Sequence, residues 1–149
     1  MDMRDLYEEV ILDHNRNPRN YPRRPEGSNR DASGHNPLCG DQVEIHLKVE
    51  DDIIRDVGFE GQGCAISTAS ASLMTEAVKG HSVAEARALF AALHALLLGE
   101  EAPDDSVDIG KLAVLSGVRE FPMRVKCATL PWHTLEAAIE DRAEAVTTE

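Results

Sequence analysis

Polar and apolar side chains alternate strictly along one run near the middle of the chain. Its apolar residues are Val43, Ile45, Leu47 and Val49, and the polar residues between them are Glu44, His46, Lys48 and Glu50. Successive side chains of a β-strand point to opposite faces, so the run predicts a strand whose polar face, with His46, lies in solvent. A second apolar run covers residues 53–59 after the turn residues 50–52. Together they predict an antiparallel hairpin.

Helical patterns flank this hairpin on both sides. Stretches with helical periodicity or helix-start residues are 3–14, 66–79, 82–98, 109–115 and the segment that begins at Pro122. Ser82 and Glu85 have the spacing of a capping box, and Gly80 and Gly99 are predicted to end the helices before them. We expect Pro131 to break or restart the last helix, because proline has no N–H to donate.

The remaining segments have weaker signals. The prolines and asparagines of residues 15–37 predict a loop, with a short strand near 31–35. The pair Ser116-Gly117 is expected to close the helix of residues 109–115. Residues 140–149 are expected to fray from the end of the last helix.

Length and charge restrict the class of protein. The chain of 149 residues has the usual size of one domain, here 1–149. Its formal net charge of −12 argues against nucleic-acid binding, because phosphates would be repelled. No stretch approaches the roughly 18 apolar residues of a membrane span, and no secretory leader is evident. With three cysteines, an odd count, we expect a cytoplasmic protein with reduced thiols.

A local basic patch departs from the acidic average of the chain. It consists of Arg16, Arg19, Arg23, Arg24 and Arg30. Two interpretations are open: a solvated loop face, or a docking surface for an acidic protein partner.

Four side chains that can bind a metal lie in separate motifs. Cys39 and Asp41 are two positions apart, on either side of Gly40, which suits a tight turn. Cys64 follows a glycine-rich stretch at the start of a predicted helix, where free N–H groups and the macrodipole favour a thiolate. Cys127 lies near another predicted helix start. These residues form a four-ligand hypothesis.

Zinc accepts thiolate and carboxylate ligands in tetrahedral geometry. Three cysteines and one aspartate would leave no open position, which favours a structural ion. However, the spacing lacks the C-x-x-C pairs of structural zinc modules, and one carboxylate among thiolates favours a site with an exchangeable ligand. A thiolate is also the form that accepts sulfane sulfur. The motifs alone therefore indicate a metal but no substrate.

Four ordered motifs resemble the SufU branch of the IscU/NifU-N-like family. They are residues 6–14 with Asn17-Pro18-Arg19-Asn20, residues 36–41, residues 61–67 and residues 124–130. IscU-type scaffolds carry a histidine before the third cysteine, where this chain has Lys126. Their chaperone-recognition segment, Leu-Pro-Pro-Val-Lys, is replaced by residues 120–126, and residues 103–121 resemble the extra segment of SufU proteins. These differences favour the SufU branch.

The resemblance implies an α+β fold of the IscU/SufE-like type, with a small antiparallel sheet of about three strands covered by helices. It also implies zinc on Cys39, Asp41, Cys64 and Cys127, and an enzyme role as a zinc-dependent sulfurtransferase. Cys39 would accept persulfide sulfur from a SufS-type cysteine desulfurase and supply downstream iron-sulfur assembly scaffold proteins. Two alternatives stay open: a scaffold that holds a [2Fe-2S] cluster on the same ligands, and a purely structural zinc domain.

Overall fold

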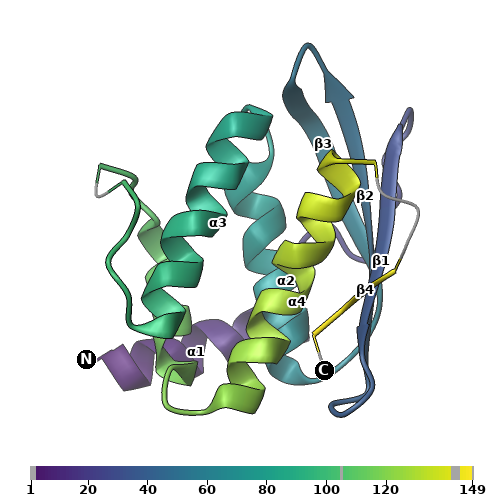
Figure 1. Ribbon diagram of the computed structural model, residues 1–149. Coiled ribbons are helices and arrows are strands. Elements are labelled where there is room, and N and C mark those ends of the chain that lie inside the picture. Colours follow the sequence, from purple (N-terminus) through teal and green to yellow (C-terminus); the bar gives the residue numbers. More distant parts are fainter. Residues whose placement is uncertain (1–2, 105, 142–144, 149) are drawn as a thin grey trace.

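The computed structural model describes residues 3–104, 106–141 and 145–148. In these residues a mixed sheet forms one layer, and helices pack against one of its faces (Figure 1). The strands are β1 (Arg30–Asn36), β2 (Asp41–Glu50), β3 (Ile53–Gln62) and β4 (Val146–Thr147). The helices are α1 (Met3–Arg16), α2 (Ala65–Val78), α3 (Val83–Leu98), α4 (Pro122–Ile139) and the 3-10 helix η1 (Gly110–Val118). The α+β fold expected from the resemblance is confirmed.

The predicted hairpin forms the centre of the sheet, whose strand order is β3-β2-β1-β4. Strands β1, β2 and β3 are antiparallel, and β2 and β3 are joined at residues 51–52, which adopt positive φ. On the apolar face of β2, Val43, Ile45 and Leu47 are buried beneath the helices, and Val49 at its end is partly buried. The polar face differs from the expectation at one residue, because His46 is buried instead of solvent-facing.

The capping signals are correct. Ser82 caps α3 through a complete capping box with Glu85, and Gly99 ends that helix in the left-handed conformation, with φ at 73°. Helix α2 has Lys79 as its C-terminal cap, and Gly80 follows at φ 86°. The short helix predicted at 109–115 is a 3-10 helix that continues through Ser116-Gly117 to Val118, so the predicted stop there is wrong.

Two expectations near the C-terminus are also wrong. Helix α4 runs through Pro131 without a restart. Buried packing holds it, since Leu130, Pro131 and Trp132 all lie in the interior, and the Ser70 hydroxyl donates to the carbonyl of Ala128 at 2.6 Å. The segment expected to fray contains β4, which adds a parallel fourth strand beside β1. Residues 142–144 and 149 lie outside the described residues.

Candidate metal centre

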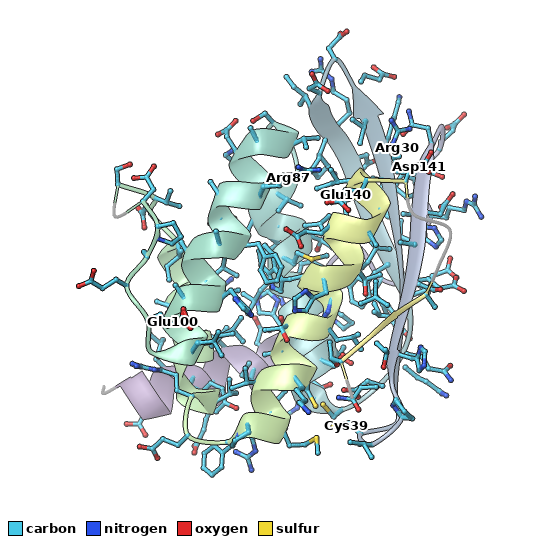
Figure 2. The ribbon with its side chains drawn as sticks, in the orientation of Figure 1. Arg30, Cys39, Arg87, Glu100, Glu140 and Asp141 are labelled. Atoms are coloured by element: carbon cyan, nitrogen blue, oxygen red, sulfur yellow. The ribbon has the colours of Figure 1, made fainter. Side chains whose placement is uncertain are left out.

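Three separate parts of the chain meet where the β1–β2 turn approaches α4. Figure 2 shows Cys39 on this turn, beside the first turns of α4. The turn is tight because Asn36 Oδ1 accepts the Leu38 N–H at 3.0 Å and Gly40 takes φ 72°, a value that favours glycine. The turn is also exposed, with Leu38 65% accessible and Cys39 half-buried.

Asp41 connects the turn to the start of α2. Its side chain is 1% exposed, and Oδ1 accepts the backbone N–H of Cys64 at 2.7 Å. Its Oδ2 lies 3.7 Å from Cys64 Sγ. Gly63 allows this approach, because a Cβ there would lie 2.7 Å from Asp41 Oδ1. The glycine before Cys64 is therefore required by the carboxylate.

Cys127 completes the group from α4. Its Sγ lies 3.0 Å from Cys39 Sγ, and its side chain is 4% exposed. One ligand atom each from Cys39, Asp41 and Cys127 lies within 4.8 Å of the others. Cys64 adjoins this group through Asp41. The structure thus brings together all four residues that the sequence singles out.

Burial dominates the electrostatics of the thiols. It raises the pKa of the Cys64 thiol, and the nearby Asp41 carboxylate raises it further. The Ser67 N–H at 3.4 Å acts in the opposite direction, so the expected thiolate-favouring effect of the helix start is present but outweighed. Burial also raises the pKa of Cys127, together with hydrogen bonds to Cys39 and Asp41. A nearby cation would be needed to favour the thiolates.

The donor set fits a soft or borderline metal ion. Converging thiols with a single carboxylate suit zinc or iron-sulfur chemistry, whereas magnesium and calcium prefer oxygen ligands alone. His133, which the sequence places near Cys127, lies elsewhere: its ring packs at 5.0 Å from Phe90 and 5.8 Å from His94 between centroids.

A contact that sequence reasoning missed lies beside this group. Asn36 Nδ2 donates to Thr148 Oγ1 at 3.3 Å, and this hydroxyl is 3.4 Å from the carbonyl of Lys126, to which it donates. Thr148, directly after β4, therefore bridges the Cys39 turn and the helix of Cys127. The only sequence signal was the run of three β-branched residues Val146-Thr147-Thr148, which is too short to predict a strand.

The basic patch is largely paired within the chain. Arg19 Nη2 lies 2.8 Å from Asp13, Arg23 Nη2 2.6 Å from Asp56, and Arg24 Nη2 3.3 Å from Asp31. These ion pairs favour the solvated loop face over a free docking surface. Separately, none of the described helices has the length and apolar character needed to cross a membrane.

Comparison with known proteins shows the family of the chain. Residues 6–142 match the model of the family described as NifU-like N terminal domain. The zinc-dependent sulfurtransferase SufU of Bacillus subtilis is 43% identical over 137 residues, covering 90% of this chain and 89% of that protein. The iron-sulfur cluster assembly scaffold protein IscU of Streptococcus pyogenes is 40% identical, covering 94% of this chain and 86% of its own length.

A solved structure extends the likeness to three dimensions. The crystal structure of FiSufU from Fervidobacterium islandicum has a TM-score of 0.83 and 37% identity, covering 91% of this chain and 97% of that one. Sequence and fold lead to the same assignment. The chain belongs to the family of NifU-like N-terminal domains, which it shares with SufU and IscU proteins.

Proposed function

We propose that this protein is a zinc-dependent sulfurtransferase of iron-sulfur cluster assembly. In this proposal Cys39, Asp41, Cys64 and Cys127 hold the zinc ion, and Cys39 accepts sulfur. The partner is a SufS-type cysteine desulfurase, and downstream scaffold proteins in the cytoplasm receive the sulfur. The proposal is supported by the 43% identity to a protein that bears the name of this activity.

The position of Cys39 carries the proposal. Cys127 is buried in a helix, and Cys64 caps another helix and is half-buried like Cys39, but only Cys39 lies on an exposed turn. A partner can therefore approach the Cys39 sulfur without unfolding a helix. Asp41, Cys64 and Cys127 are the residues suited to retain the ion while Cys39 reacts.

The proposed step is a thiol–persulfide exchange. Bound zinc would supply the positive charge that keeps the three cysteines deprotonated near neutral pH. The Cys39 thiolate attacks the outer sulfur of the desulfurase persulfide and forms a new S–S bond. The old S–S bond breaks, and the desulfurase cysteine leaves as a thiolate. Cys39 then carries the persulfide, and no external oxidant is consumed.

Sulfide release from L-cysteine under reducing conditions tests this function. A SufS-type desulfurase would be assayed alone, with the zinc-loaded protein, and with Cys39→Ser whose zinc content and fold have been checked. We expect strong acceleration by the unmodified protein alone. Mass spectrometry before reduction should find one added sulfur atom on the peptide that contains Cys39.

The opposite outcomes identify the alternatives. Absence of acceleration, with zinc present and the desulfurase active, would contradict the transfer function. If Cys39→Ser changes only the free energy of unfolding, the ion is structural. Equal acceleration by Cys39→Ser would exclude Cys39 as acceptor.

An IscU-like scaffold is the second candidate, favoured by the 40% identity to the Streptococcus pyogenes scaffold. It would assemble a [2Fe-2S] cluster on the same residues. Anaerobic incubation with ferrous iron, L-cysteine and a desulfurase separates the two. A scaffold becomes coloured and holds iron and sulfide after desalting, whereas a transferase stays colourless and retains about one zinc ion per chain.

A further inference from the structure

A second cluster of potential metal ligands lies on the face of the sheet opposite the helices. Glu44 and His46 are two residues apart on β2, so their side chains share a face. Glu60 on β3 pairs directly with Glu44. One ligand atom from each of Glu44, His46 and Glu60 lies within 4.8 Å of the others. Three residues of two strands thus converge, and neither strand carries a cysteine.

His46 is oriented as a ligand would be. Its side chain is 5% exposed, and Nδ1 lies 2.6 Å from Asp31 Oδ1 on β1. The other ring nitrogen, Nε2, is buried and has no hydrogen-bond partner among the described residues. It faces Glu44 Oε2 at 3.9 Å and Glu60 Oε1 at 3.7 Å, too far for hydrogen bonds. A carboxylate on one ring nitrogen is the usual support of a histidine that binds metal through the other.

The charges around this nitrogen also favour a cation. Glu44 and Glu60 are cross-strand neighbours, and like charges in directly opposite positions destabilise a sheet. Arg24 reaches the cluster only through Asp31, at 3.3 Å from its Oδ2. Both glutamates remain accessible, and they line a surface hollow of about 390 Å³ whose lining does not include His46. An ion could therefore reach the two carboxylates from solvent.

We propose that His46 Nε2, Glu44 and Glu60 form a second site, for a divalent first-row transition metal. One imidazole and two carboxylates suit manganese, ferrous iron or zinc, and the positions facing solvent would hold water. Ligands about 2.1 Å from one ion lie about 3–3.5 Å apart. The two distances from Nε2 therefore need only a small closing movement of the exposed glutamates. The site holds no thiol and is independent of the proposed sulfur transfer.

Manganese is the probe that tests this site, because it prefers oxygen and nitrogen ligands to thiolates. Protein loaded with one equivalent of zinc is titrated with Mn²⁺, and free Mn²⁺ is followed by electron paramagnetic resonance. Glu44→Gln and Glu60→Gln remove a ligand charge each from exposed positions. The matched control, Glu50→Gln, makes the same change at an exposed position of the same strand.

We expect the unmodified protein to bind one Mn²⁺ per chain in addition to the zinc. The Kd for Mn²⁺ should be at least tenfold higher in Glu44→Gln and in Glu60→Gln. Glu50→Gln should stay within twofold of the unmodified protein. Paramagnetic broadening of the His46 ring signals would locate the ion. Lack of saturable Mn²⁺ binding would overturn the proposal. Equal weakening by all three variants would overturn it too, as it indicates diffuse attraction to an acidic surface.

Discussion

Asp41 connects the β1–β2 turn to Cys64 at the start of α2 through its two carboxylate oxygens. Oδ1 accepts the Cys64 N–H, while Oδ2 faces the thiols. Asp41→Ala should lower zinc affinity at least tenfold, by loss of a charged ligand. It should also lower the free energy of unfolding of the zinc-free protein by about 1–3 kcal/mol, since the Cys64 N–H loses its partner.

Asp41→Asn is the matched control, because an amide oxygen can still accept the Cys64 N–H. It should lose zinc affinity and largely keep the stability of the zinc-free protein. Chelator competition measures the first quantity and urea unfolding the second. Wild-type zinc affinity in Asp41→Ala would show that the carboxylate is no ligand.

The Arg23–Asp56 pair gives the stability a dependence on pH. Hydrogen bonds from Arg23, assisted by the Val57 N–H and Lys79, hold the pKa of Asp56 well below its usual range. Because the folded pKa is depressed, the contribution is fully present above the unfolded pKa of about 3.9 and is lost as pH falls toward the folded value. Arg23→Gln should lower the free energy of unfolding by about 1 kcal/mol at pH 7. This value is reduced because the pair is partly exposed to solvent.

Urea unfolding at pH 7, 5 and 3 measures this effect. The difference between Arg23→Gln and the unmodified protein should be similar at pH 7 and 5 and smaller at pH 3. Arg55→Gln removes the same charge from an exposed side chain of β3 and should have little effect at any pH. A difference independent of pH would exclude the pair as its cause.

His46 and the four candidate metal ligands show what a sequence can predict about single residues. The motifs singled out Cys39, Asp41, Cys64 and Cys127 because their thiols and carboxylate can bind a metal ion. The alternation placed His46 on the correct face but not at the correct depth. His46 pairs with Asp31 of β1 and Gly58 of β3, in a register that no local pattern encodes.

At the scale of elements, the contact between β1 and α4 depends on one small residue. A Cβ at Gly34 would lie 2.2 Å from Thr134 Oγ1 and 3.1 Å from Leu130 Cδ1. Gly34→Ala should therefore destabilise the protein by about 1–3 kcal/mol, measured by urea unfolding. Ser33→Ala, at the exposed neighbouring position, should have little effect.

A double-mutant cycle shows whether this clash is the cause. Thr134→Ala removes the Oγ1 atom that the new methyl group would meet. The double variant Gly34→Ala/Thr134→Ala should lose less free energy of unfolding than the two single variants lose together, because the clash is relieved. Simple additivity would mean that Gly34 matters only for backbone conformation.

Capping residues and periodicity predicted most elements, since these signals are local. Pro131 was misleading because proline disfavours a helix interior only until burial outweighs the cost, here through packing around Trp132. Strand β4 could not be predicted, because its two residues are held by pairing with β1 and not by their own propensity. Local signals failed where contacts between distant segments decide the structure.

For the whole molecule, zinc binding should raise thermal stability. An ion that binds only the folded chain contributes about 2.7 kcal/mol when its free concentration is a hundred times Kd. For a chain of this size, that corresponds to a Tm higher by about 5–10 °C. Calorimetry of zinc-loaded and chelator-treated protein measures the difference, and added magnesium should not restore it. Equal Tm values would argue against ligands from three distant segments.

If these four residues hold zinc, as proposed, their spread along the chain has a consequence for biosynthesis. A ribosome makes Cys39, Asp41 and Cys64 before α4, which carries Cys127. An ion captured by the unfinished chain lacks the last thiolate and dissociates more readily. The complete set exists only after α4 has packed against the sheet. Tight metal retention therefore marks a finished chain, and a newly made protein that is truncated before Cys127 would return its metal to the cell.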